Sequence, residues 1–125
     1  MGEATKAFGA RFATAFTEKD FERAGELLHP AVDFRALTPS RFWEARSPEQ
    51  VTSEILPRWL EPQDDVQSLD SLESERVADR ERVGYRFTVT NPDGRFVVEQ
   101  QAYVSERDGK IDWMRVVCSG FRPVA

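Results

Sequence analysis

Three polar side chains that could do chemistry alternate along one short stretch of the chain: Glu99, Gln101 and Tyr103. A carboxylate can serve as a general acid or base, and a phenol or an amide can donate a hydrogen bond to a developing oxyanion. Side chains two residues apart lie on the same face of a strand. We therefore predict Glu99 and Tyr103 as catalytic candidates, with Gln101 binding the substrate.

Each of these residues also has a purely structural explanation. A buried carboxylate or amide can be satisfied by neighbouring side chains in a closed network, and a tyrosine can pack its ring with the hydroxyl at the rim. The chemical hypothesis therefore depends on which way residues 97 to 103 face. If Glu99 faces a helix-covered hollow, desolvation would raise the pKa of its carboxyl group and suit it to proton transfer.

The facing of this stretch follows from the preceding turn, Asn91-Pro92-Asp93-Gly94. Proline suits the second position of a tight turn, and glycine is free to take a positive φ at a bulge. In that register Phe87 faces Glu99 and Tyr85 faces Gln101, all on one face of the sheet. The same face carries the apolar residues Val83, Val89 and Val97, so we expect it to point inward.

The last strand allows two registers, because the turn at 106–109 can form a three-residue loop with a bulge or a four-residue loop. The first register would turn inward Trp113, Arg115 and Val117. The second would turn inward Asp112, Met114, Val116 and Cys118. We favour the second, since three of its four side chains are apolar; the first would let Arg115 pair with Glu99 in a structural network.

Helices must cover this sheet, and the first half of the chain supplies their patterns. Phenylalanines recur every four residues at Phe8, Phe12 and Phe16, which predicts a helix over about 3 to 17 with one buried stripe. Asp20 can cap a second short helix that Pro30 ends. A third helix begins at Ser47-Pro48 with Gln50 completing a capping box, and its apolar stripe is Val51, Ile55 and Trp59. Pro57 should kink this helix or end it soon after.

Between the helices lie a strand and a loop. Val32, Phe34 and Ala36 alternate with polar neighbours and predict a short strand, whereas 38–46 has no periodicity and is expected to be a loop carrying Phe42 and Trp43. A strand over 66–79 and a long antiparallel meander follow. The order predicts an α+β fold over 1–125 as a single domain, with three N-terminal helices on one face of a strongly curved antiparallel sheet that has a mixed edge.

A pocket between those helices and the sheet would be lined mainly by large apolar side chains. Besides Gln101, we expect the substrate-binding residues to be Tyr85, Phe87, Phe12, Phe34, Trp43, Trp59, Met114 and Cys118.

Composition excludes several classes of function. The formal net charge of −5 gives no positive field to attract nucleic acid or an anionic membrane. One cysteine and one histidine supply neither a disulfide nor the usual zinc ligands, and the scattered glycines form no phosphate loop. No signal segment or apolar run of 18 residues is present. We expect a cytoplasmic protein that needs no metal or cofactor.

Several stretches together resemble the NTF2-like superfamily and, within it, the SnoaL-like proteins. The resemblance rests on the phenylalanine-rich first helix, the short helix ending Leu-Leu-His-Pro before Ala31-Val32-Asp33-Phe34, the capped third helix and the turn Asp108-Gly109-Lys110-Ile111. Residues 37–45, 99–103 and 118–123 look like a small actinobacterial subgroup. The resemblance implies a cone-shaped fold, often dimeric through its sheet, that is used by ketosteroid isomerases, polyketide cyclases, dehydratases, epoxide hydrolases and non-catalytic subunits.

For two of those enzymes, the residues that the activity requires are not found at the matching positions of this chain. Similarity to ketosteroid isomerase would require a tyrosine and two aspartates where this chain has Phe12, Ala36 and Gln101. Similarity to limonene epoxide hydrolase would require an inward Asp-Arg-Asp set, but Asp112 and Arg115 differ in parity on one strand.

The leading hypothesis is a homodimer whose pocket binds a small hydrophobic metabolite, with isomerisation, cyclisation or dehydration by proton transfer at Glu99. The alternative is a non-catalytic dimer or interaction module whose cavity is filled by its own side chains. An outer face carrying Phe96, Val98 and Val104 would support the alternative, because such a patch is best buried against a second copy.

Overall fold

Helix α1, Phe8–Thr17, forms where the phenylalanine repeat predicts it. Phe12 and Phe16 are 1 % exposed and point into the core, while Phe8 lies at its margin. The computed structural model describes residues 7–124, so the predicted helical start at 3–6 lies outside the described residues.

Helix α2, Phe21–Glu26, is capped by Asp20, whose carboxylate accepts a hydrogen bond from the backbone N–H of Arg23 at 3.2 Å. The prediction that Pro30 ends this helix is wrong. Strand β1, Leu28–Thr38, starts before Pro30, because Leu28 already pairs with Ile111 of strand β6. The chain has therefore left the helix before it reaches the proline.

The third helical stretch begins at Pro48 and ends at Trp59, in three segments: α3 (Pro48–Gln50), the π-helical η2 (Val51–Ile55) and α4 (Leu56–Trp59). The hydroxyl of Ser47 accepts a hydrogen bond from the N–H of Gln50, as the capping pattern predicts. Pro57 has no N–H to donate, and the wider π turn ends just before it, at Ile55. The helix ends at Trp59, so the early end, one of the two predicted outcomes, is confirmed.

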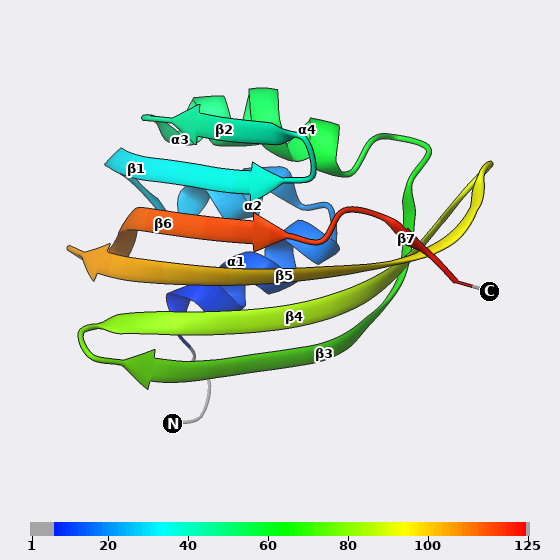
Figure 1. The fold of residues 1–125 in the computed structure, drawn as a ribbon. Coiled ribbons are helices and arrows are strands. Elements are labelled where there is room, and N and C mark those ends of the chain that lie inside the picture. Colours follow the sequence, from blue (N-terminus) through cyan, green and yellow to red (C-terminus); the bar gives the residue numbers. More distant parts are fainter. Residues whose placement is uncertain (1–6, 125) are drawn as a thin grey trace.

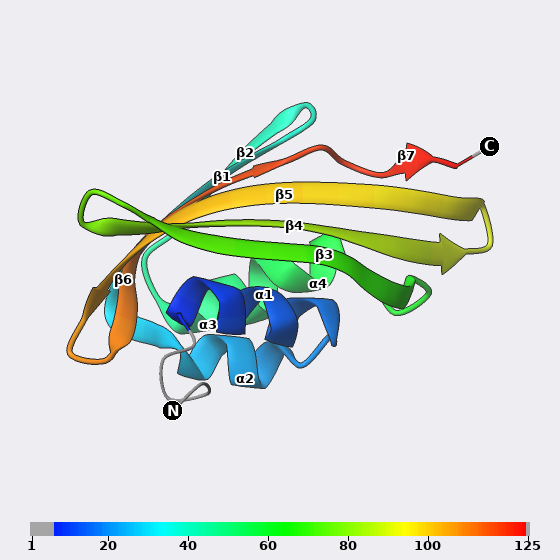
Figure 2. The ribbon, with the colours of Figure 1, turned by 90° about the horizontal axis from the view of Figure 1, so that it is seen from below.

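The sheet runs in the order β2-β1-β6-β5-β4-β3, with β7 beside β5. Besides β1, its strands are β2 (Arg41–Ala45), β3 (Asp65–Val77), β4 (Arg80–Asn91), β5 (Gly94–Arg107), β6 (Lys110–Cys118) and β7 (Arg122–Pro123). Only β1 and β6 pair in parallel among the described strands. The helices lie against one face, called here the inner face (Figures 1 and 2), and the opposite, outer face carries no helix within 7–124. The predicted α+β fold, with mixed strand directions in its sheet, is confirmed.

Strand β2 replaces most of the predicted loop at 38–46. It pairs antiparallel with β1, so Trp43 lies opposite Ala36 and Phe42 opposite Leu37. The strand sends its two rings to opposite faces. Trp43 packs edge-to-face on Trp59 at 6.0 Å, and Phe42 is 53 % exposed.

The core lies between the inner face and the helices. Its largest fully buried side chains come from every layer, and they include Phe12, Phe16, Phe34, Leu56, Phe87 and Met114. None of the helices within the described part of the chain is long and apolar enough to span a membrane.

Candidate functional site

The β4–β5 hairpin has a register that differs by one residue from the predicted one. Asn91 pairs directly with Gly94, so Tyr85 lies opposite Gln100 and Arg86 lies opposite Glu99. The predicted partners, Phe87 with Glu99 and Tyr85 with Gln101, are therefore wrong.

The turn itself explains the difference. Only Pro92 and Asp93 form the loop, and the side chain of Asn91 accepts a hydrogen bond from the N–H of Asp93 at 2.8 Å. Gly94 joins the ladder with a φ of 133° and forms no bulge. Since side chains alternate along a strand, a shift of one residue moves every β5 side chain to the other face.

The three polar residues singled out first consequently lie on the outer face. Glu99 is ion-paired with Arg86 at 2.9 Å and with Arg122 at 2.5 Å, and its side chain is 43 % exposed. The hydrogen bond from Arg86 lowers the pKa of the Glu99 carboxyl group, the opposite of the predicted shift. Gln101 is exposed and Tyr103 is 38 % exposed. The structure corrects the inward placement of all three.

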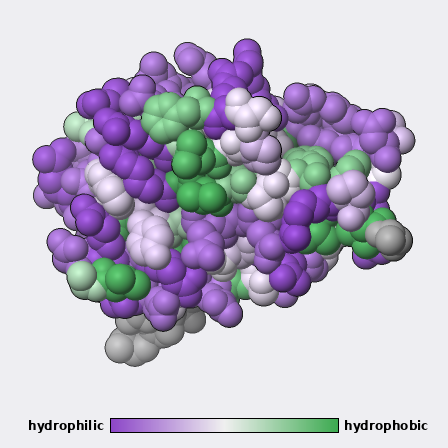
Figure 3. Space-filling model, in the orientation of Figure 1, coloured by the Kyte–Doolittle hydropathy of each residue, from purple (hydrophilic) through white to green (hydrophobic). Residues whose placement is uncertain are grey.

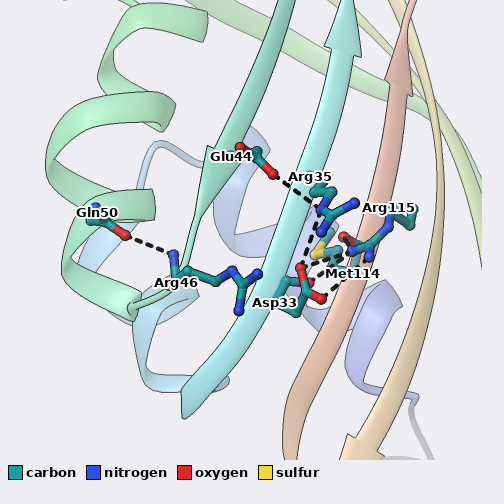
Figure 4. A network of polar contacts seen from close by, with 7 residues as sticks. All are labelled: Asp33, Arg35, Glu44, Arg46, Gln50, Met114 and Arg115. Carbon is teal, nitrogen blue, oxygen red and sulfur yellow. Dashed lines mark hydrogen bonds and ion pairs between the residues drawn. The ribbon is translucent and has the colours of Figure 1, made fainter.

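These residues border a broad, open groove of about 670 Å³ on the outer face. Its charged groups are already paired with one another or with neighbouring residues. Arg82 binds Glu75 at 2.7 Å, and Arg115 lies 3.4 Å from Asp33 in the network of Figure 4. Arg115 therefore pairs with Asp33 on β1 and not with Glu99.

From Met114 onward the side chains of the last strand face as predicted, although the turn differs and Ile111, not Asp112, is fully buried. Lys110 pairs with Arg107 around a two-residue loop, and a bulge between Ile111 and Trp113 restores the favoured facing. Met114 and Val116 are 0 % and 2 % exposed on the inner face.

A second, smaller pocket of about 140 Å³ lies on the inner face, between the end of α4, strands β4 and β5, and the segment after β6. We call it the inner pocket. It is lined by Phe16, Thr38, Arg58, Trp59, Phe87, Val98, Gln100, Cys118, Gly120 and Phe121.

Three of the predicted binding residues, Trp59, Phe87 and Cys118, line this pocket. The other apolar ones fill the core beside it. Phe12, Phe34 and Met114 are at most 1 % exposed, and Trp43 packs edge-to-face on Trp59.

One polar pair is buried in this apolar surrounding. The hydroxyl of Tyr85, 4 % exposed, donates a hydrogen bond to Oε1 of Gln100 at 2.5 Å, and Gln100 is 2 % exposed. Burial raises the pKa of Tyr85 above its ordinary value of 10, so the phenol remains a neutral donor. The indole Nε1–H of Trp59 is also buried, and no described residue accepts its hydrogen bond.

Sequence reasoning missed two residues that matter here. Gln100 was placed on the other face by the register error, and only a two-residue turn would have brought it opposite Tyr85. Glu81 lies in a stretch dense in charged residues, where solvent exposure would be expected, yet it is 5 % exposed. Its parity with Val83 and Tyr85 on the same strand was the signal that could have identified it.

No protein-family model matches the sequence, and no curated protein matches it. Solved structures do. A protein from Catenulispora acidiphila with a ketosteroid isomerase-like fold, in complex with trimethylamine, matches with a TM-score of 0.71 and 14 % identity over 92 % of this chain and 87 % of that one. An NTF2-like protein from Burkholderia thailandensis matches with a TM-score of 0.68 and 19 % identity over 90 % and 88 %.

A third match is an LEH-like epoxide hydrolase from M. tuberculosis, with a TM-score of 0.62 and 13 % identity over 86 % of this chain and 77 % of that one. These similarities agree with the strand order and the helix-covered inner face described above, and with the curved sheet seen in Figure 2. The chain has the NTF2-like, ketosteroid isomerase-like fold.

Proposed function

We propose that the chain binds a small, largely apolar molecule in the inner pocket, with Gln100 as its polar anchor. The observation that carries the proposal is the hydrogen-bonded Tyr85–Gln100 pair, which is buried among apolar side chains beside the inner pocket. A buried amide is costly unless it is satisfied, and here Tyr85 occupies only its oxygen. The amide Nε2 donates to none of the described residues and is free for a ligand.

The similar structures support the same function at the level of the fold. One of them was solved in complex with trimethylamine, and another is described as an epoxide hydrolase. A similar fold alone does not show that two proteins share a ligand or an activity. The proposal for this chain therefore rests on its own pocket.

The pocket favours binding over the predicted proton transfer. Isomerisation, cyclisation or dehydration needs a general base within hydrogen-bond reach of the substrate. Of the described residues that line the inner pocket, none carries a carboxylate or an imidazole. The predicted base, Glu99, lies on the opposite face of the sheet.

Two adjacent glutamines offer a matched test. Gln100 faces the inner pocket and Gln101 faces outward, so Gln100→Leu and Gln101→Leu make the same chemical change on opposite faces. Ligand-observed NMR with benzyl alcohol and benzaldehyde would measure binding. We expect Gln100→Leu to weaken binding about tenfold, the loss of roughly one hydrogen bond, and Gln101→Leu to leave it unchanged. Equal effects of the two variants, or probe contacts mapped to the outer face, would overturn the proposal.

A second function, self-association through the outer face, is favoured by a different observation. Leu37 pairs with Phe42 on one side and with Val117 on the other, and all three are more than half exposed. Figure 3 shows an apolar patch interrupting the polar surface over β1 and β6. The patch predicted from Phe96, Val98 and Val104 is not the one present, since Val98 and Val104 are buried.

Exposed apolar patches of this kind are typical of surfaces between copies of a chain. Sedimentation equilibrium would test the second function. We expect Val117→Glu to shift a dimer to monomer and Glu106→Gln, at an exposed site elsewhere, to leave the dimer intact. A wild-type protein that is monomeric at high concentration would exclude this function.

A further inference from the structure

Among the described residues that line the inner pocket, Trp59 and Gln100 carry N–H groups without acceptors, whereas the side-chain acceptor atoms each already take a hydrogen bond. Trp59, which lines the pocket, has a buried indole N–H with no acceptor among the described residues, and the Nε2 of Gln100 is unpaired while Tyr85 holds its oxygen. Leaving a buried donor unsatisfied costs free energy of folding, so a ligand that accepts a hydrogen bond recovers that cost.

The remaining polar groups of the pocket are already used. The hydroxyl of Thr38 accepts from Nε1 of Trp43 at 2.9 Å and donates to the carbonyl of Arg41 at 3.3 Å. The sulfur of Cys118 accepts from the N–H of Gly120 at 3.3 Å. Both side chains are therefore already engaged within the protein.

Arg58 is the one charged residue among the described residues that line the pocket, and its charge is positive. Arg58 lines the pocket, is exposed to solvent, and forms no ion pair with any residue in 7–124. An arginine fork matches a carboxylate in geometry as well as in charge. The rest of the wall is apolar and includes Phe16, Phe87, Val98 and Phe121.

The size of the pocket limits the ligand. Its volume of about 140 Å³ is well below the range of roughly 300–1,000 Å³ for sites that take drug-sized molecules. A cavity of about 150 Å³ lined by apolar side chains is large enough for a benzene ring.

We propose that the ligand of the inner pocket is a small monocarboxylate with one apolar ring or a short apolar chain. Arg58 pairs with the carboxylate at the mouth, the N–H of Trp59 and the Nε2 of Gln100 donate to it or to an adjacent acceptor, and the phenylalanines enclose the apolar body. This inference rests on the proposed function, because it names the ligand class of the same site.

The test compares benzoate with benzyl alcohol, which has a similar size and no charge, by isothermal calorimetry and NMR at neutral pH. We expect benzoate to bind at least about tenfold more tightly than benzyl alcohol. Arg58→Gln should remove most of that preference. Arg46→Gln, which deletes the same charge at an exposed site outside the pocket, should preserve it.

A second variant separates the hydrogen bond from the charge. Trp59→Phe keeps an aromatic ring and removes only the donor, so we expect weaker benzoate binding and nearly unchanged binding of benzyl alcohol. Unchanged benzyl alcohol binding also shows that the variant is folded with its pocket intact.

The possible failures are distinguishable. If both probes bind in the inner pocket with equal affinity, or if Arg58→Gln leaves the preference intact, the carboxylate assignment is wrong and the proposed function stands. If neither probe binds, the proposed function fails with it.

Discussion

The carboxylate of Glu81, on strand β4, accepts a hydrogen bond of 2.7 Å from the backbone N–H of Gly9, at the start of helix α1. It also accepts from the N–H of Ala10 at 3.1 Å and from the hydroxyl of Ser74 at 2.8 Å. Helix α1 has no acidic residue in its own first turn and no side-chain cap of its own. A residue 72 positions away therefore satisfies its free N–H groups and ties the helix to the sheet.

Replacing this carboxylate should destabilise the fold. We expect Glu81→Gln to lower the free energy of unfolding by about 1–3 kcal/mol, because the buried helix donors lose a charged acceptor. Urea unfolding followed by circular dichroism would measure the loss. The exposed Glu106→Gln should change stability by less than about 0.5 kcal/mol, and an equal loss in both variants would contradict the capping role.

Gly120, in the segment after β6, lines the inner pocket and lies close to Pro39. Gly120 has a φ of 75°, and a Cβ there would lie 2.7 Å from the ring of Pro39. Gly109 has a φ of 77° with nothing within 4 Å, so Gly109→Ala reports backbone strain alone. We expect Gly120→Ala to cost about 1–3 kcal/mol and clearly more than Gly109→Ala. Thermal unfolding of the two variants would compare them, and similar losses would show that the Pro39 contact is unimportant.

Tyr85 makes the fold sensitive to alkali. Its pKa is raised in the folded state by burial, so the unfolded chain loses the phenolic proton first as pH rises. Stability should therefore be unaffected by this group below about pH 10 and should fall above it. Tyr85→Phe should flatten that fall in urea titrations at alkaline pH.

The spectroscopic form of this experiment uses Tyr103→Phe, which leaves Tyr85 as the one tyrosine of the chain. Its phenolate absorbance should appear only together with unfolding. Phenolate formation in the folded state would show that Tyr85 is not sealed from solvent.

Glu99 should matter for acid stability and not for ligand binding. Its pKa is lowered in the folded state by the hydrogen bond from Arg86, so its contribution is present above the ordinary carboxyl pKa and is lost as pH falls through the folded value. We expect Glu99→Gln to leave the affinity for benzyl alcohol unchanged while reducing the acid dependence of stability. A large loss of affinity for benzyl alcohol in this variant would show that Glu99 takes part in ligand binding.

Local signals predicted the helices and two of their N-terminal caps, although not the end of α2. The phenylalanine repeat of α1, the Asp20 cap of α2 and the Ser47 cap with Pro57 downstream each depend on neighbours within one or two turns, which the sequence displays directly. The inward facing of Met114 followed from its apolar character.

The errors arose where a distant partner decides the structure. Strand β2 forms because β1 lies beside it, and the polar segment around Trp43 shows little of that pairing locally. Glu81 is buried because a helix start lies above it. The β4–β5 register depended on whether Gly94 would form a bulge, and both outcomes are compatible with the same four turn residues.

The loop between β4 and β5 holds only Pro92 and Asp93, and this length determines which of the alternating side chains of β5 face the interior. The two-residue loop thereby separates two sets of alternating side chains on β5: Val98, Gln100 and Ala102 are buried against the interior, whereas Glu99, Gln101 and Tyr103 lie on the solvent side.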